Sequence, residues 1–402
     1  MEYLSCFRHT DLLHTEEPLW RYRPGGYHPV HLGDAFQNGR YTVHHKLGFG
    51  SSSTVWLVDD NENEQWVALK IKTAVSSTLS PEIRNLERLG QQSDFVVQLL
   101  DEFSLSGPNG THQCLVFELL GPSLHWVLED YHKTDDTLDT ETIIRLAEQI
   151  LHAVESIHDA GMAHGEICAA NIAFTSSRLS RLTGGEMFQV TGRPQWEEVV
   201  RSDGQPLDKG LPKYIVEACK WDEWSDEYEE SLRVLDLEHA FIQGEKPKPF
   251  SQRGPLRVPE SIFTKSLDYR VDLWTAGCVI YALIFQSNPF IFTGSDADLV
   301  RSMVSFVGCL PGEWKQEWEQ MKTESGDVIE ETEVPPGSEL KRRFNEGGHD
   351  PELACLMPLI QGLIKFQPKN RLTAAEALEL LYNQIDDVVL SGYTERFGTS
   401  KI

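Results

Sequence analysis

The sequence predicts an α+β protein in which a small antiparallel β lobe precedes a larger α-helical lobe. Between residues 41 and 120, short segments rich in β-branched and aromatic residues alternate with turns, which is typical of antiparallel strands. From residue 121 onward, apolar residues recur every three or four positions, as on one face of a helix. The chain has 402 residues, of which 40% are hydrophobic, so it is long enough to bury the cores of both lobes.

The predicted sheet has about five strands, and one helix interrupts them. This helix is expected from Ser80 to Leu89, with Pro81 in its first turn, where a missing backbone N–H costs nothing. The strand segments are Tyr41 to Gly48, Ser53 to Asp60, Trp66 to Lys72, Val96 to Leu105 and Gln113 to Leu119.

Three helices of the second lobe are the clearest. Residues 141–161 place apolar side chains on one face, and Gly161 ends the pattern. Residues 271–286 are apolar on nearly every face, so we expect a buried central helix there. Residues 374–385 predict a last amphipathic helix.

These elements divide the chain into an arm, two lobes and a tail. Residues 175–231 and 320–350 carry few periodic signals and contain acidic runs, so we predict that both are surface insertions of the second lobe. The predicted parts are an N-terminal arm at 1–40, the β lobe at 41–120, the helical lobe at 121–390 and a tail at 391–402.

Composition limits the partners and the compartment. Lys and Arg total 36 and Asp and Glu total 62, which gives a net charge of −26. Such a field repels nucleic acid and anionic lipid and favours a basic protein partner, although acidity that serves only solubility is the simpler interpretation. The seven cysteines form no C-x-x-C pair. We therefore expect reduced thiols in an intracellular monomer of the cytoplasm or nucleus, with no membrane segment.

A Gly/Ser-rich turn joins the first two predicted strands. Glycines at Gly48 and Gly50 let backbone N–H groups approach a phosphate without an intervening Cβ. This signal is weak alone, because hairpin turns without a ligand are often rich in glycine. The whole stretch is Leu47, Gly48, Phe49, Gly50, Ser51, Ser52, Ser53, Thr54 and Val55.

Lys70 strengthens the phosphate-binding interpretation. It follows Ala68 on a strand that is expected to be buried, where an ammonium group needs a partner. Glu82 on the next helix can provide one. An edge lysine with its head in water remains the structural alternative.

Two later segments carry further polar groups. The sequence His164 to Asn171 has the spacing of the H-R-D-L-x-x-x-N catalytic loop of protein kinases, with Glu166 at the base position. Asp236 stands where the D-F-G aspartate is expected. Glu260 and Arg371 occupy positions at which we expect a buried ion pair.

Taken together, these motifs resemble a eukaryotic protein kinase, and more narrowly the fungal branch of the serine/arginine-protein kinases. The segment from Gly25 to Leu57 is similar to the segment that begins the kinase domain in that family, and residues 116–121 and 305–314 resemble two more of its segments. The resemblance covers roughly residues 20–390 and is weakest at 175–231. It implies the bilobal protein kinase-like fold and transfer of phosphate from ATP to serines in Arg/Ser-rich proteins.

The resemblance also implies a role for each site residue. The nine residues of the turn, with Ala68, Glu118 and Leu120, would contact ATP, and Lys70 oriented by Glu82 would bind its phosphates. Asn171 and Asp236 would hold Mg²⁺, and Glu166 would act as base.

Three positions depart from the family pattern. The base aspartate is Glu166, the lysine two residues later is Cys168, and the D-F-G glycine is Glu238. One added methylene in the base shifts its carboxylate by about 1.5 Å, and a misplacement of that size can cost roughly 100-fold in rate. Two hypotheses therefore stand: a kinase with attenuated activity, or a pseudokinase that binds nucleotide and basic partners without transferring phosphate.

Overall fold

The computed structural model describes residues 7–8, 15–77, 81–89, 93–201, 203–221, 224, 230–245, 247, 254–325 and 337–397. The chain divides into two compact units, and each consists of several separate segments. The first unit contains Met1–Leu86, Val97–Pro122 and Phe174–Ser231, and the second contains Glu87–Val96, Ser123–Ala173 and Leu232–Ile402.

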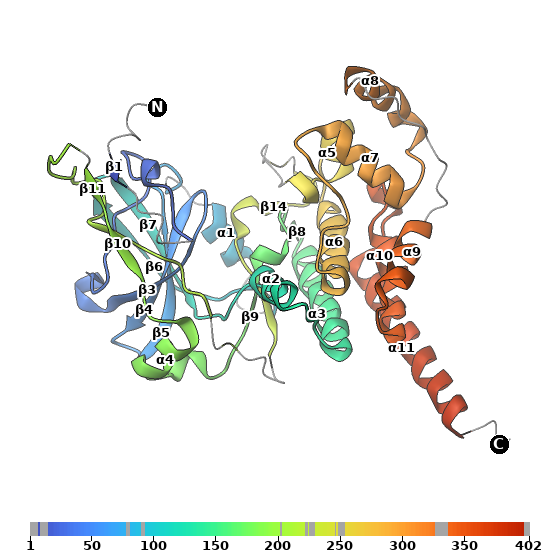
Figure 1. The fold of residues 1–402 in the computed structure, drawn as a ribbon, viewed down its shortest axis with the longest axis horizontal. Coiled ribbons are helices and arrows are strands. Elements are labelled where there is room, and N and C mark those ends of the chain that lie inside the picture. The colour runs from blue at the N-terminus through green and yellow to red at the C-terminus, as the bar shows by residue number, and fades with distance from the viewer. Residues whose placement is uncertain are drawn as a thin grey trace. The chain divides into compact units, whose positions relative to one another are not determined.

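A six-stranded antiparallel sheet forms the centre of the first unit (Figure 1). Its strand order is β2-β3-β4-β5-β7-β6. The predicted strands are confirmed, and β2 is an additional short edge strand. The bounds are β2 Ala35–Phe36, β3 Tyr41–Phe49, β4 Ser53–Asp60, β5 Gln65–Lys72, β6 Leu99–Gly107 and β7 Gly110–Glu118, and helix α1 covers Pro81–Leu89.

The two faces of this sheet differ because successive strand residues point to opposite sides. On one face, Trp56, Val58 and Leu69 belong to an apolar cluster that also includes Val30 of the arm and Val216. The odd-numbered residues of β4 and the even-numbered residues of β5 point to the opposite face. There Val55 lies opposite Lys70 in the ladder, and Ala68 lies two residues before it. The phosphate-binding candidates therefore share the face opposite the apolar cluster.

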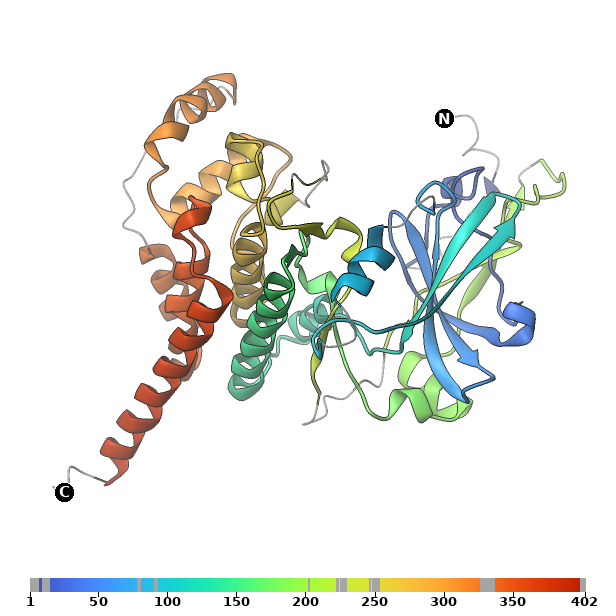
Figure 2. The same ribbon diagram turned by 180° about the vertical axis from the view of Figure 1, so that it is seen from behind.

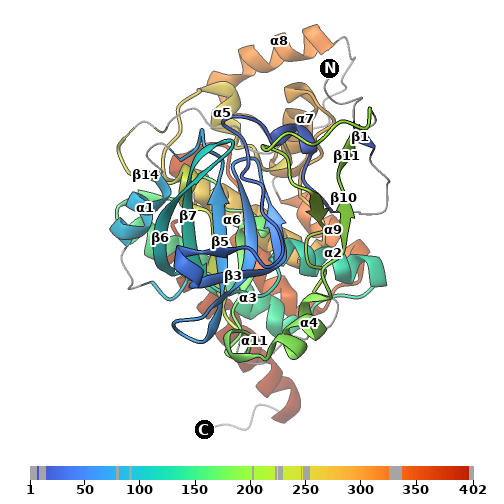
Figure 3. The same cartoon turned by 90° about the vertical axis from the view of Figure 1, so that its left-hand side faces the viewer.

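Residues 175–231 differ from our prediction, because they belong to the unit of the sheet and not to the helical unit. The indole Nε1 of Trp66 donates to the carbonyl of Leu182 at 2.6 Å, and Nζ of Lys46 donates to the carbonyl of Val216 at 2.6 Å. Figure 3 shows this green segment beside the blue strands. Its elements are α4 Gly184–Thr191, β10 Trp196–Glu198, β11 Val200–Arg201, which pairs with β1 Phe7–Arg8, and β12 Tyr214–Val216, which pairs with β10.

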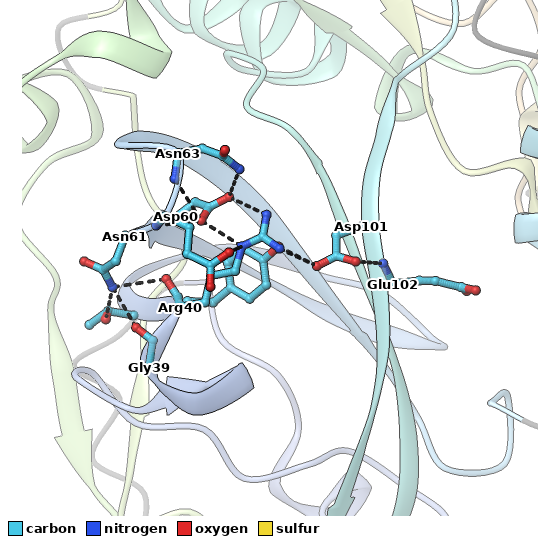
Figure 4. A network of polar contacts seen from close by, with 10 residues as sticks. Gly39, Arg40, Asp60, Asn61, Asn63, Asp101 and Glu102 are labelled. Atoms are coloured by element: carbon cyan, nitrogen blue, oxygen red, sulfur yellow. Dashed lines mark hydrogen bonds and ion pairs between the residues drawn. The ribbon is translucent and has the colours of Figure 1, made fainter.

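A polar network closes the end of the sheet where β3 begins (Figure 4). The Arg40 guanidinium donates two bonds of 2.9 Å to Asp60 and one of 3.2 Å to Asp101. The hydroxyl of Tyr41 also donates to Asp101, at 2.7 Å. Burial raises the pKa of the Asp60 carboxyl, but hydrogen bonds from Arg40 and Asn63 outweigh this effect and hold the pKa below its ordinary value.

His45, which lies in β3, should make the stability of the first unit depend on pH. Its side chain is 2% exposed, and burial lowers its pKa from 6.5 to about 4. The unfolded chain therefore binds more protons between these values, so stability is complete above pH 6.5 and falls toward pH 4. We expect a loss of about 2 kcal/mol from this residue between pH 7 and pH 5, and His45→Gln should remove it. Urea unfolding monitored by tryptophan fluorescence at both pH values measures the effect.

The comparison of wild type and His45→Gln at pH 7 is the internal control for this experiment, because it isolates the change in packing. The prediction concerns only the difference between the two pH values. Equal pH dependence of the two proteins would contradict it.

The second unit is built on three long helices, as the periodicity predicted. Helix α3 (Thr140–Asp159) is capped at its N-terminus by Asp139, whose carboxylate accepts the N–H of Thr142 at 2.9 Å. In α6 (Val271–Phe285), every residue from Val271 to Ile284 is buried, as expected for a helix that is apolar all round. Helix α6 packs against α3 and α10 (Met357–Leu363), and α3 packs against α11 (Ala374–Phe397) (Figure 2).

Shorter elements complete the second unit. Its other helices are α2 Leu124–Thr134, α5 Pro259–Phe263, α7 Asp296–Val307, α8 Lys315–Ser325 and α9 Ser338–Gly347. Its short strands are β8 Met162–Ala163, which pairs with β14 Phe241–Ile242, and β13 Leu232–Val234, which pairs with β9 Ile172–Phe174. Within the described ranges, no helix is long and apolar enough to cross a bilayer.

Part of the second predicted insertion is integrated into the fold. Helix α9 buries Leu340 and Phe344, and the Arg343 guanidinium donates to the hydroxyl of Tyr281 in α6 at 2.8 Å. Residues 326–336 lie outside the described residues, as do most of the acidic run 221–230 and residues 246 and 248–253 of the segment between Asp236 and Glu260. The predicted tail at 391–402 is largely a continuation of α11, which extends to Phe397.

Candidate active site

The glycine turn lies between β3 and β4, as the sequence predicted. Phe49 pairs with Thr54 in the ladder, and the N–H of Gly50 donates to the carbonyl of Ser53 at 2.9 Å. Neither Gly48 nor Gly50 has a positive φ, and no described atom lies within 4 Å of a Cβ added to either residue. Neither local strain nor close packing thus explains these glycines. Open space above glycines is what a phosphate-binding turn requires.

The predicted pair of Lys70 and Glu82 is present. Nζ of Lys70 lies 2.7 Å from the Glu82 carboxylate, and the side chains are 10% and 1% exposed. Helix α1 supplies Glu82 from its first turn. A third residue, Lys72, was not anticipated. It shares a face of β5 with Lys70, its side chain is fully buried, and its ammonium lies 3.3 Å from Glu82. The two-residue period of a strand was the available signal for it.

The end of β7 and the chain after it carry two of the residues expected to contact ATP. Glu118 ends β7, and its backbone N–H donates to the carbonyl of Gln98 at 3.1 Å while its carboxylate accepts the N–H of Gln98 at 2.9 Å. Leu120 is 8% exposed, and the N–H of Gly121 donates to the carbonyl of Phe174 at 2.8 Å. Contact of Glu118 and Leu120 with a nucleotide stays a prediction.

In the second unit, Asp272 holds the start of the loop that contains Glu166. Its buried carboxylate accepts the backbone N–H of His164 at 2.7 Å and that of Gly165 at 2.8 Å, and it lies 3.1 Å from Nε2 of His158. Helix α6 carries Asp272 in its first turn. The carboxylate thus joins this loop to the central helix.

Gly165 occupies the position at which the family pattern has arginine, and the local backbone explains the glycine. Its φ is +83°, and an added Cβ would lie 2.8 Å from the carbonyl oxygen of His239. A side chain there would therefore be strained and would also clash with the segment after Asp236.

The loop brings Glu166, Asn171 and the residues before Asp236 together. Nδ2 of Asn171 donates to the carbonyl of Glu166 at 3.0 Å, and the N–H of Leu235 donates to the carbonyl of Asn171 at 2.8 Å. His164 is fully buried, and its Nε2 lies 2.9 Å from the carbonyl of Leu235. These bonds fix the orientation of the Asn171 amide next to the chain that carries Asp236.

Two residues near Glu166 bear on its chemistry. Cys168 is 2% exposed, so its thiol is embedded in the fold. Nε2 of His239 lies 3.7 Å from the Glu166 carboxylate, and the His239 side chain is 40% exposed. No motif marks His239; only the folded loop brings it close to Glu166.

The predicted ion pair of Glu260 and Arg371 is confirmed. The guanidinium donates to the two carboxylate oxygens at 2.7 and 2.6 Å, and both side chains are at most 2% exposed. The same guanidinium also donates to the carbonyls of Lys365 and Arg270, at 2.9 and 2.8 Å. This pair therefore links α5 to the chain that precedes α11.

Known proteins resemble this chain in the same regions. Residues 41–183 match the family described as "Protein kinase domain", a span that includes the glycine turn, Lys70, Glu82 and Glu166. Protein kinase dsk1 of Schizosaccharomyces pombe is 35% identical over 218 residues, which cover 48% of this chain and 40% of that protein. Human SRSF protein kinase 3 is 38% identical over 162 residues, which cover 38% of this chain and 28% of that protein.

A serine/threonine protein kinase of Aspergillus fumigatus matches over a longer range. It is 26% identical over 389 residues, which cover 90% of this chain and 89% of that protein. By contrast, the matched part spans less than half of the fission-yeast and human relatives. Residues 41–183 therefore resemble a protein kinase domain, and the sequence is similar to those of the SR protein kinases.

Proposed function

We propose that this protein is an ATP- and Mg²⁺-dependent serine/threonine kinase that phosphorylates serines in basic, Arg/Ser-rich proteins at a reduced rate. The observation that carries the proposal is the buried contact of 2.7 Å between Lys70 and Glu82. Burying two charged groups is costly, and the family uses this pair to bind the phosphates of ATP. The open space above Gly48 and Gly50 supports the same assignment.

The second unit would supply the groups that act on the metal and the substrate. Asp236 and the amide oxygen of Asn171 are hard oxygen ligands of the kind that Mg²⁺ prefers, and the Nδ2 bond from Asn171 to the Glu166 carbonyl keeps that amide oriented. When bound, Mg²⁺ would neutralise negative charge on the phosphates. Glu166 would accept the proton of the substrate serine hydroxyl. The serine oxygen would then form the bond to the γ-phosphorus while the bond from that phosphorus to ADP breaks and ADP leaves.

Three features support a basic substrate and a slow reaction. The net charge of −26 favours a basic peptide over an acidic one. Cys168 cannot provide the charged donor that a lysine would, which removes about 1.5–3 kcal/mol of interaction. Glu238 adds a negative charge two residues after Asp236. These departures lower the expected rate, but they leave Lys70, Glu82, Asn171 and Asp236 in place.

A pseudokinase is the second candidate, and the buried position of Cys168 favours it. In that case the protein would bind nucleotide and a basic partner without transferring phosphate. The acidic surface would then serve binding alone. The two candidates share the nucleotide and differ only in the chemical step.

Phosphate transfer to an Arg-Ser repeat peptide separates the two candidates. We expect radiolabel from γ-labelled ATP to appear in the peptide, above the level of Asp236→Ala, and not in a peptide with alanine at every serine. Transfer equal to that of Asp236→Ala would exclude the enzyme. A thermal shift with Mg-ATP provides the second measurement, because a ligand that binds the folded state raises the melting temperature. The absence of a shift would exclude nucleotide binding from both candidates.

A further inference from the structure

The N-terminal arm contacts the glycine turn through two hydrogen bonds to its backbone. The hydroxyl of Tyr27 donates to the carbonyl of Gly50, and Nη1 of Arg21 donates to the carbonyl of Ser51 at 2.6 Å. Both acceptors are consecutive carbonyls at the tip of the turn. The Tyr27 side chain is 1% exposed, whereas Gly50 and Ser51 are exposed. A buried part of the arm therefore holds an exposed part of the turn.

A buried charge cluster anchors this arm to the strand that leads into the turn. Glu17 accepts hydrogen bonds from the hydroxyl of Tyr22 and from Nζ of Lys46. Lys46 belongs to β3 and is fully buried, and Glu17 is 1% exposed. The ring of Tyr22 packs edge-on against Tyr27, with centroids 5.5 Å apart. Burial raises the pKa of Tyr22 well above its ordinary value, so its hydroxyl remains a donor at neutral pH.

A second set of contacts fixes the position of Tyr27 from the other side. Nδ2 of Asn109, in the turn between β6 and β7, donates to the carbonyl of Tyr27 at 2.7 Å, and the N–H of Gly25 donates to the carbonyl of Asn109 at 2.7 Å. The N–H of Tyr27 donates to the carbonyl of Arg21 at 3.0 Å, which closes a tight loop. Gly26 lies inside this loop, where an added Cβ would lie 1.9 Å from the Arg21 carbonyl oxygen. The arm is thus a rigid support.

The planarity of the peptide bond transmits this support to the groups that face a ligand. The carbonyl of residue i and the N–H of residue i+1 belong to one rigid plane and point in opposite directions. A bond that holds the carbonyl of Gly50 therefore fixes the N–H of Ser51, and a bond to the carbonyl of Ser51 fixes the N–H of Ser52. Backbone N–H groups of such a turn are the donors that bind phosphate.

We propose that Tyr27 and Arg21 are positioning residues for the phosphates of ATP, because they fix the peptide planes of the glycine turn before the nucleotide binds. This inference rests on the proposed function. A turn that is already ordered loses less entropy on binding, so the contribution concerns phosphate recognition and not the adenosine part. No motif in the arm indicated this role, since the arm makes its contribution through backbone carbonyls.

The test compares Mg-ATP with adenosine in binding to the full-length protein. One net hydrogen bond corresponds to roughly a 5-fold change in an equilibrium constant. We expect Tyr27→Phe to weaken the binding of Mg-ATP by about 5-fold and to leave the affinity for adenosine within about 2-fold of the wild-type value. Arg21→Gln should act in the same direction. In the transfer assay, KM for ATP should rise while kcat changes less.

Tyr41→Phe is the matched control. It also removes a hydroxyl from the first unit, because Tyr41 is buried and donates to Asp101 from the first residue of β3, at the end away from the glycine turn. It should lower stability to a similar extent and leave the ratio of ATP to adenosine affinity unchanged. Hydrogen exchange of residues 50–53 without nucleotide gives a readout that requires no ligand, and we expect it to be about 5-fold faster in Tyr27→Phe.

The outcomes separate the failure of this inference from the failure of the proposed function. Wild-type protein that binds no Mg-ATP would overturn both. Wild-type protein that binds Mg-ATP, together with a Tyr27→Phe variant whose ATP-to-adenosine ratio or turn exchange is unchanged, would overturn the positioning role alone. If the affinities for Mg-ATP and adenosine fall equally, Tyr27 contributes only to the general stability of the fold, and this result would also overturn the positioning role.

Discussion

Arg371→Ala should lower the free energy of unfolding by about 3–5 kcal/mol, because it leaves the carboxylate of Glu260 buried without its cation. The guanidinium side chain is fully buried, and its five donor contacts end on Glu260 and on the backbone carbonyls of three residues. It also lies over the ring of Trp274, 5.1 Å from the centroid. Denaturant unfolding followed by tryptophan fluorescence measures the loss.

Arg342→Ala is the control for this variant. Arg342 also pairs with carboxylates, those of Glu339 and Glu346, but its side chain is 54% exposed. When Arg342 is removed, water solvates the exposed carboxylate of Glu346, and Glu339 keeps its bond of 2.8 Å from Arg343, so little change in stability is expected. A loss for Arg371→Ala as small as that for Arg342→Ala would show that the buried pair is not a main source of stability.

Glu166→Gln should reduce phosphate transfer by about 10²- to 10⁴-fold, the contribution of a positioned general base. The substitution keeps the size of the side chain and removes only the basic carboxylate. Backbone contacts of the loop, from Glu166 N–H to Nδ1 of His164 at 3.2 Å and from Nδ2 of Asn171 to the Glu166 carbonyl at 3.0 Å, do not depend on that carboxylate. Binding of Mg-ATP should therefore be retained, as a thermal shift can check. Initial rates of radiolabel transfer measure the chemical step.

Glu166→Asp and His239→Gln test the specificity of this result. Glu166→Asp keeps the carboxylate and should retain transfer, at a rate that depends on the reach of the shorter chain. His239→Gln removes the group 3.7 Å from Glu166, and an exposed pair of this kind should change the rate by less than about 10-fold. If Glu166→Gln transfers phosphate as fast as the wild type, another group acts as base.

The elements that the sequence predicted best are those whose signal is local. The apolar residues of α3 recur on one face, and those of α6 cover all faces. Both patterns lie within the helix itself, so they predict the two helices without knowledge of distant contacts. The contact between Lys70 and Glu82 could be predicted because an ammonium group on a buried strand is costly without a partner of opposite charge. The same argument applied to Lys72, two residues further along the strand, would have added it to the pair.

What the sequence did not reveal depends on contacts between distant segments. Strands β10 and β12 have three residues each, too few for an alternating pattern, and β12 is held against the sheet by Lys46, 170 residues earlier. His239 approaches Glu166 only through the course of the loop after Asp236. In the arm, Tyr22 and Tyr27 are buried. Trp20, however, is 44% exposed and lies beneath the guanidinium of Arg21.

The interleaving of the two units along the chain has a consequence for biosynthesis. The core of the first unit needs Val216, so a nascent chain cannot complete that core until much of the second unit's sequence, from Ser123 to Ala173, has left the ribosome. Contacts of such long sequence separation slow folding, because closing large loops costs entropy before the contacts form. Until then, the incomplete sheet would expose unpaired strand edges and apolar surface, to which chaperones would bind during translation.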